Sequence, residues 1–136
     1  MRGRCVSWSD LHYSGMPSYK TGQQLLDEAR ARVTEISARD AIALRTSNPD
    51  AVFLDIREQP EVNLGMIPGA IHLARGSMET KIEALVPRDS RVVVYCANGN
   101  RSAFAADTLQ QMGYPKVASM AGGFRDWVAC GGDVNG

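Results

Sequence analysis

Short runs of apolar residues recur along the chain from residue 21 onward, and each is separated from the next by a segment of helical periodicity. The apolar runs predict β-strands at residues 33–36, 51–55, 91–96 and 117–120, and residues 67–72 form a turn that leads into a further strand. The run at 91–96 is the clearest of these, because it is continuous, rich in β-branched valine and ends at Cys96.

The segments between these strands carry apolar residues three and four positions apart, which is typical of helices that cover a sheet. The predicted helices cover residues 21–32, 37–44, 58–64, 78–85 and 101–112, and a last one follows Gly122-Gly123. Ser37 and Asp40 have the spacing of a capping box, which opens the second helix. Gly113 and Gly131 end the last two helices. Phe124 and Trp127, at helical spacing in the last one, are expected in the core.

Strands that alternate with helices predict an α/β fold with a mainly parallel sheet. Ligands of such sheets bind outside the carboxyl ends of the strands. Asp55 and Cys96 each stand at the carboxyl end of a predicted strand. We therefore expect both residues at one edge of the sheet.

Length and charge limit the classes of protein to consider. The 136 residues fit one domain, which we place at residues 21–136, and residues 1–20 are expected to be a poorly ordered extension. The 15 basic and 15 acidic residues cancel, which argues against a general nucleic-acid binder. No apolar run is long enough to span a membrane, and no apolar segment follows the basic N-terminus as in a signal peptide. A cytoplasmic location is expected.

The three cysteines are sparse and unevenly spaced, at positions 5, 96 and 130. No pair has a C-x-x-C spacing and only two histidines are present, so no metal site is expected. The odd count also argues against a disulfide framework. Cys130 is expected to pack in the last helix, and Cys5 falls in the extension.

The segment from Cys96 to Ser102 joins the clearest strand to a helix. Glycine and asparagine tolerate left-handed dihedral angles, so this loop can curl tightly at the start of the helix. A curled loop there turns backbone N–H groups inward, and these donors with the helix dipole stabilise a thiolate. Arg101 adds a permanent positive charge. The arrangement suits an activated cysteine nucleophile facing an anion site, although a buried, inert cysteine at a strand end is the alternative.

Four motifs in order along the chain give a specific resemblance. They are Leu54-Asp55-Ile56-Arg57-Glu58, Gly65-Met66-Ile67-Pro68-Gly69-Ala70-Ile71-His72, Tyr95-Cys96-Ala97-Asn98-Gly99-Asn100-Arg101-Ser102 and Gly122-Gly123-Phe124-Arg125-Asp126-Trp127. Over residues 33–131 the chain resembles the rhodanese-like sulfurtransferases. The resemblance implies a five-stranded, mainly parallel sheet flanked by helices on both faces.

The resemblance also implies a reaction. The Cys96 thiolate takes the outer sulfur of thiosulfate or a related persulfide donor, and a Cys96 persulfide passes it to cyanide or a thiol. This covalent mechanism needs no cofactor. The implied partners are a small sulfur donor, a thiol or cyanide acceptor and a sulfur-relay protein, with no nucleic acid and no membrane.

The resemblance and the loop chemistry together assign roles to individual residues. Cys96 is the expected nucleophile. The expected persulfide-binding loop consists of Ala97, Asn98, Gly99, Asn100, Arg101 and Ser102. Asp55 is expected to position this loop and Arg57 to lie near the substrate, unless Arg57 is a solvated surface residue. Arg101 is expected to close the loop, to form a structural salt bridge such as one with Asp55, or both. Ala97 stands where some thiosulfate-using relatives carry a basic residue, which predicts a low affinity for thiosulfate.

Two other functions stay open at this point. A phosphatase or arsenate reductase of the same fold has five residues between the cysteine and the arginine, whereas only four stand between Cys96 and Arg101. The tighter ring of N–H groups suits one sulfur atom and crowds a phosphate. A non-catalytic rhodanese-like binding module is the second alternative, but such relatives usually lack the cysteine that this chain retains.

Overall fold

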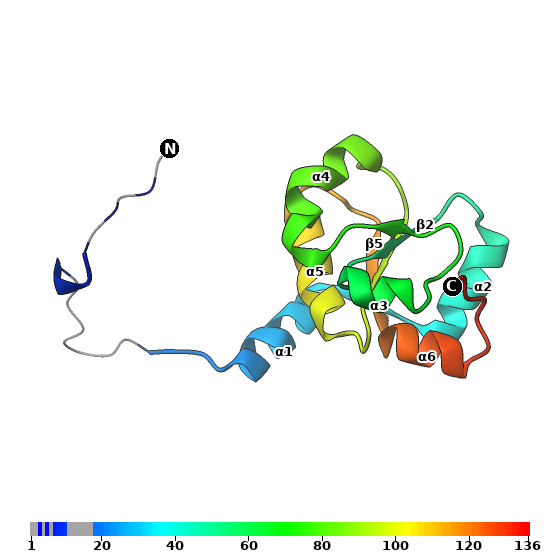
Figure 1. Cartoon of the computed structure of the whole chain (residues 1–136), viewed down its shortest axis with the longest axis horizontal. Coiled ribbons are helices and arrows are strands. Elements are labelled where there is room, and N and C mark those ends of the chain that lie inside the picture. The colour runs from blue at the N-terminus through cyan, green and yellow to red at the C-terminus, as the bar shows by residue number, and fades with distance from the viewer. Residues whose placement is uncertain (1–2, 4, 6, 11–17) are drawn as a thin grey trace.

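The computed structural model describes residues 3, 5, 7–10 and 18–136. The extension expected at residues 1–20 lies largely outside this part, which includes one short helical turn there, Trp8–Asp10. From residue 18 a stretch of chain leads into helix α1, Gly22–Arg32, which lies against the rest of the domain (Figure 1).

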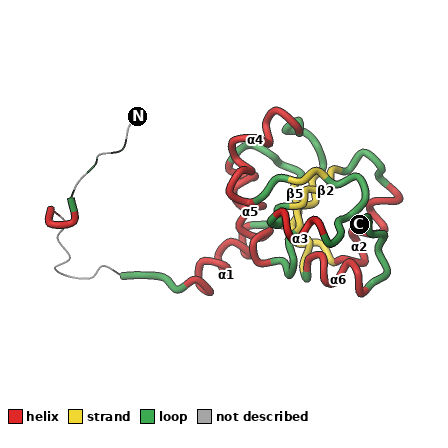
Figure 2. The backbone as a smooth tube through the Cα atoms, viewed as in Figure 1, coloured by secondary structure: helices red, strands yellow, loops and turns green. Residues whose placement is uncertain are grey.

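Five strands form a single sheet at the centre of the domain (Figure 2). They are β1 (Thr34–Ser37), β2 (Val52–Asp55), β3 (Ile71–His72), β4 (Val92–Tyr95) and β5 (Val117–Ala121). Their order across the sheet is β1-β5-β4-β2-β3, and every pairing between them is parallel. The predicted α/β fold with a five-stranded, mainly parallel sheet is therefore confirmed, and the five predicted strands are present with shifts of one or two residues at their ends.

Helices cover both faces of the sheet (Figure 1). The remaining α-helices of the described part are α2 (Ala38–Ser47), α3 (Gln59–Asn63), α4 (Met78–Leu85), α5 (Asn100–Gln111) and α6 (Gly123–Ala129), and a short 3-10 turn, Arg75–Ser77, precedes α4. Successive side chains of a strand point to opposite faces, so Val92 and Val94 pack with α4 and α5, whereas Val93 and Tyr95 pack with α2 and α6. The apolar core is thus divided into two clusters by the sheet.

Local sequence signals explain where the helices begin. The hydroxyl of Ser37 accepts a hydrogen bond from the amide of Asp40, as expected for the cap of α2, although this helix runs three residues past the predicted end at residue 44. Thr21 and Gln24 form a full capping box at the start of α1, which the sequence analysis did not identify. Both caps satisfy amides that a helix start leaves without partners.

The predictions for the last helix are confirmed only in part. Trp127 is buried against Phe53, and Phe124 is half-buried beside the same cluster, as expected for core residues. Cys130, however, is exposed, so its expected packing role is wrong. It caps the carboxyl end of α6 just before Gly131, where the chain has already left the core.

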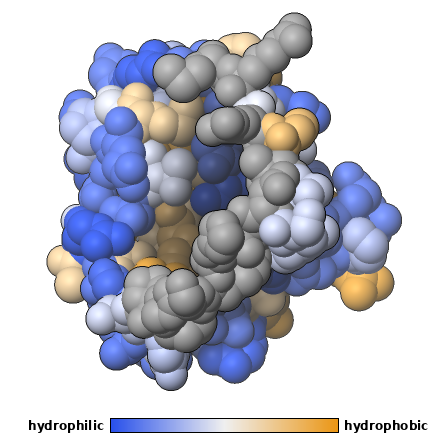
Figure 3. All heavy atoms as spheres, turned by 90° about the vertical axis from the view of Figure 1, so that its left-hand side faces the viewer, coloured by the Kyte–Doolittle hydropathy of each residue, from blue (hydrophilic) through white to orange (hydrophobic). Residues whose placement is uncertain are grey.

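Much of the outer surface is hydrophilic in the view of Figure 3, where apolar residues appear only in patches. Within the described residues no helix has the length and hydropathy needed to cross a membrane.

Candidate active site

Cys96 follows β4 directly, and its buried sulfur lies against the backbone of the loop that leads into α5. The amide of Gly99 donates to Sγ over 3.2 Å and the amide of Ser102 over 3.3 Å. Gly99 makes this possible with a φ of +96°, a left-handed conformation that favours glycine. The side chain is thus fully buried, as an inert cysteine would be, yet its sulfur is turned toward two N–H donors at a helix start.

The amide of Asn100 has a different partner from those of Gly99 and Ser102. The side-chain carbonyl of Asn98 accepts from the amide of Asn100 over 3.2 Å, so this amide is engaged by the loop itself. Arg30 of α1 donates to the side-chain oxygen of Asn100 over 2.9 Å. Asn98 and Asn100 therefore fix the outer side of the loop, and Ala97 contributes no polar side chain.

The start of α6 holds the loop from behind. Phe124 donates its amide to the carbonyl of Cys96 over 2.8 Å, and Arg125 donates to the carbonyl of Ala97 over 3.1 Å. Gly123, with a φ of +59°, lets the two segments approach this closely, since a Cβ at that position would lie 2.5 Å from the Cys96 carbonyl oxygen. The loop carbonyls are thereby turned away from the sulfur.

A second polar contact reaches the sulfur from inside the protein. The Sγ of Cys96 lies 3.6 Å from the hydroxyl of Ser102, which is itself 2.8 Å from the hydroxyl of Ser119 on β5. All three side chains are fully buried. A buried hydroxyl without a partner is costly, so this chain explains why a polar residue is tolerated at position 119 inside the apolar core.

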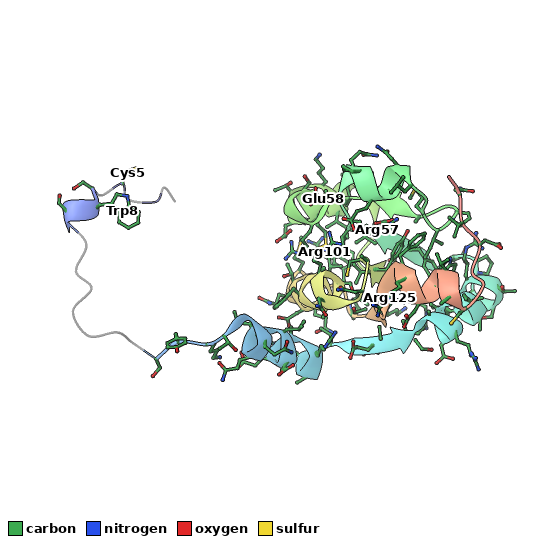
Figure 4. The ribbon with its side chains drawn as sticks, turned by 60° about the horizontal axis from the view of Figure 1, so that its bottom comes forward. Cys5, Trp8, Arg57, Glu58, Arg101 and Arg125 are labelled. Carbon is green, nitrogen blue, oxygen red and sulfur yellow. The ribbon has the colours of Figure 1, made fainter. Side chains whose placement is uncertain are left out.

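Arg101 forms a two-pronged ion pair with Glu61 of α3. Both terminal nitrogens of Arg101 lie 2.9 Å from the carboxylate oxygens. The guanidinium and a bond from the Glu58 amide lower the pKa of Glu61 to about 2, although partial burial opposes this. The pair keeps Glu61 charged at neutral pH. Figure 4 shows Arg101 with Arg57, Glu58 and Arg125, which come from the neighbouring loop and helices.

Asp55 and Arg57 form a second ion pair, and this one is buried. Arg57 donates through Nε and Nη2 to the carboxylate of Asp55, with the shortest distance 2.7 Å. Burial alone would lower the pKa of Arg57, but the bonds to Asp55 raise it instead. The guanidinium carbon lies 4.2 Å from the centre of the Phe124 ring, and Nη2 also donates to the carbonyl of Gly65.

These two pairs bear on the alternatives predicted for Arg101 and Arg57. Arg101 pairs with Glu61 and not with Asp55. Arg57 is 4% exposed, so it is not a solvated surface residue. Asp55 stands at the same sheet edge as Cys96, since its register partner on β4 is Tyr95, but its ion pair is with Arg57 rather than with the loop.

Two further residues close this edge of the sheet. The buried hydroxyl of Tyr95 accepts from the amide of Ile67, and burial raises the pKa of Tyr95 far above its ordinary value, so the phenol stays protonated. The ring nitrogen Nε2 of His72 lies 2.7 Å from the carbonyl oxygen of Arg57. Both side chains contact backbone groups beside the site.

Three residues that contact the loop or its arginine were not predicted from the sequence: Glu61, Ser119 and Gly123. A serine at an alternating position of an apolar strand was the available signal for Ser119. The capping spacing of Glu58 and Glu61 marked a helix start, but nothing in the chain linked Glu61 to Arg101. Among the described residues no group of histidine, cysteine or acidic side chains is placed to hold a metal ion.

Comparison with known proteins agrees with this arrangement. Residues 37–130 match the model of the rhodanese-like domain. A sulfurtransferase from Allochromatium vinosum is 33% identical over 99 residues, which cover 73% of this chain and 92% of the relative. The thiosulfate sulfurtransferase GlpE from Tolumonas auensis is 33% identical over 97 residues, 71% of this chain and 90% of the relative. A Bacillus subtilis relative, 31% identical, is longer, and the chain spans only 58% of it.

A solved structure is also similar. A protein of unknown function from Rhodopseudomonas palustris, described as a possible tyrosine phosphatase, superposes with a TM-score of 0.78 and 39% identity, covering 89% of this chain and all of that one. The fold and the cysteine loop define an α/β domain with a buried cysteine, held by backbone amides, at the carboxyl edge of its parallel sheet. The chain belongs to the rhodanese-like family, and its sulfurtransferase relatives support a rhodanese-type transferase.

Proposed function

We propose that this protein is a sulfurtransferase in which Cys96 takes a sulfane sulfur from a small donor and passes it to a thiol or to cyanide. The observation that carries the proposal is the pair of amide donors, Gly99 and Ser102, within 3.3 Å of the Cys96 sulfur. Backbone N–H groups at a helix start favour an anionic sulfur over a neutral one. They suit both the attacking thiolate and the terminal sulfur of a persulfide.

The transfer has two half-reactions, and neither needs a cofactor. The thiolate of Cys96 attacks the outer sulfur of the donor, a new S–S bond forms, and the donor's own sulfur bond breaks with its electron pair on the leaving group. A thiolate or cyanide then attacks the terminal sulfur and returns the Cys96 thiolate. Arg101, paired with Glu61, lies in the loop, and the amides of Gly99 and Ser102 hold the anion in each state.

Burial of Cys96 sets one requirement for this chemistry. A donor cannot reach a fully buried sulfur without local movement, so the segments around the loop must open by a small amount during each turnover. Small reagents such as methyl methanethiosulfonate should therefore modify Cys96 faster than bulky aromatic disulfides, relative to their rates with the exposed Cys130.

Intact-protein mass spectrometry tests the proposal. Treatment with thiosulfate, methanethiosulfonate or glutathione persulfide should add one sulfur atom, which cyanide removes. The addition should be absent in Cys96→Ser and retained in a Cys5→Ser/Cys130→Ser variant. If none of the three donors adds a cyanide-labile sulfur to Cys96, the proposed function is wrong.

The phosphatase alternative is tested in the same preparation. Only four residues separate Cys96 from Arg101, so the loop forms a small ring that suits one sulfur atom. Both terminal nitrogens of Arg101 are bound to Glu61. We expect no Cys96-dependent hydrolysis of an aryl phosphate. A non-catalytic module would give neither activity.

A further inference from the structure

The charge around the cysteine loop is balanced almost completely. Four arginines contact the loop or flank it, and each has a carboxylate nearby: Arg30 with Glu35 at 3.7 Å, Arg57 with Asp55 at 2.7 Å, Arg101 with Glu61 at 2.9 Å and Arg125 with Asp126 at 3.6 Å. The other loop side chains, Ala97, Asn98, Gly99, Asn100 and Ser102, carry no charge. The site therefore offers an incoming donor amide dipoles but little net positive charge.

Glu61 pairs with the arginine that belongs to the loop itself. Arg101 is the only basic residue of the loop, and its two terminal nitrogens are both occupied by the Glu61 carboxylate. Glu61 is held in place by a further bond from the Glu58 amide, so the carboxylate is fixed independently of Arg101. Its ion pair with Arg101 is only partly exposed, and solvent screens it less than a surface pair.

We propose that Glu61 determines donor specificity, because it neutralises Arg101 and thereby favours sulfane donors with one negative charge or none over dianions such as thiosulfate. The natural donor class is then a hydropersulfide, R–S–SH, whose outer sulfur is attacked by the Cys96 thiolate. The new S–S bond to Cys96 forms as the S–S bond of the donor breaks, the proton stays on the transferred sulfur, and R–S⁻ leaves with the electron pair of the broken bond. This inference rests on the proposed function and names the substrate class of the same site.

Two donors of nearly equal shape isolate the charge. Thiosulfate is a dianion whose leaving group is sulfite, and methanethiosulfonate is a monoanion whose leaving group is methanesulfinate. In both cases the Cys96 thiolate takes the outer sulfur and the leaving group takes the electron pair of the broken S–S bond. The quantity to measure is the ratio of kcat/KM for thiosulfate to kcat/KM for methanethiosulfonate, with cyanide as the acceptor.

Glu61→Gln keeps an oxygen for the Glu58 amide and for one nitrogen of Arg101 but removes the charge. We expect this variant to raise the ratio about fivefold, because the dianion gains more than the monoanion from the uncompensated charge of Arg101. The rise should shrink as salt is added. Glu61→Gln/Arg101→Gln restores neutrality, so its ratio should return toward that of the wild-type protein. A merely structural role of Glu61 would give neither the salt dependence nor the return.

Glu83→Gln is the matched control. Glu83 pairs with Arg88, which bonds the carbonyl of Met112 at the far end of α5, about 18 Å along the helix from the loop. Its ratio should equal that of the wild-type protein. An unchanged ratio in Glu61→Gln, or a rise that salt does not reduce, would overturn the inference. If the double variant is inactive, the inference is decided by whether salt reduces the raised kcat/KM ratio of Glu61→Gln. Failure of both donors to load Cys96 in the wild-type protein would instead refute the proposed function.

Discussion

Gly123 lies directly against the backbone of Cys96, and this contact fixes the loop from the side opposite its sulfur. A Cβ at Gly123 would lie 2.5 Å from the Cys96 carbonyl oxygen and 2.6 Å from the Ala97 carbonyl carbon. The amides of Phe124 and Arg125 bond the same two carbonyls. The orientation of the loop amides toward the sulfur therefore depends on a residue that takes no part in the chemistry.

Gly123→Ala should displace the loop and lower the rate of sulfur loading on Cys96 by about tenfold or more, because small errors in geometry are costly in a preorganised site. Gly131→Ala is the matched control, since Gly131 has a φ of +82° but open space around it. It should lose about 1 kcal/mol of stability from the backbone alone and keep its loading rate. Reactions quenched at successive times and measured by intact-protein mass spectrometry give both loading rates. Equal rates in the two variants would contradict the positioning role.

Ser119→Ala should slow sulfur loading although Ser119 does not touch Cys96. Without its partner, the Ser102 hydroxyl loses the bond that orients it toward the sulfur. Ser102→Ala should slow loading further. The double variant should be no slower than Ser102→Ala, because groups acting as one chain are not additive. Additive effects on the loading rate would show that the two hydroxyls act separately.

Asp55→Asn should destabilise the fold strongly. It leaves the buried Arg57 guanidinium without a counter-charge, which costs about 3–5 kcal/mol. Asp107→Asn removes the partner of Arg32 in a pair that is more exposed, and solvent screening should make its cost much smaller. Urea unfolding of both variants at pH 7 gives the comparison. Similar losses in the two would mean that the buried pair contributes no more than a surface pair.

The ion pair of Glu61 predicts a dependence of stability on pH. The pKa of Glu61 is about 2 in the folded protein, below its ordinary value of 4.5. Because its pKa is lower in the folded protein, the charged Glu61 carboxylate stabilises the fold. This contribution is complete above pH 4.5 and is lost as the pH falls toward 2. Glu61→Gln should therefore be less stable than the wild-type protein at pH 7, with a difference that narrows between pH 4.5 and 2. Denaturant midpoints across this range measure it, and a constant difference would contradict the assignment.

The sequence predicted most of the fold because its signals are local. The valine run before Cys96 and the glycines after α5 and α6 mark element boundaries within a few residues. The position of Cys96 between a strand and a helix followed from the same signals. The error at Cys130 has a local cause as well, since a residue next to a helix-ending glycine no longer faces the core.

The partners of the site could not be predicted in the same way. Arg101 meets Glu61 across 40 positions of chain, and Ser102 meets Ser119 across 17. Strand order decides which distant segments become neighbours, and periodicity does not encode strand order. Asp55 and Arg57 are an exception, because residues two apart after a strand point the same way, and their pairing was open to prediction.

Within the described sheet, strand β1 pairs only with β5, which follows β2, β3 and β4 along the chain. A nascent chain that stops before Val117 has no neighbour for β1, and it also lacks Phe124 and Arg125, whose amides hold the carbonyls of the Cys96 loop. The thiol of Cys96 is therefore translated before its surroundings can assemble, and synthesis must pass Arg125 before Cys96 can be enclosed.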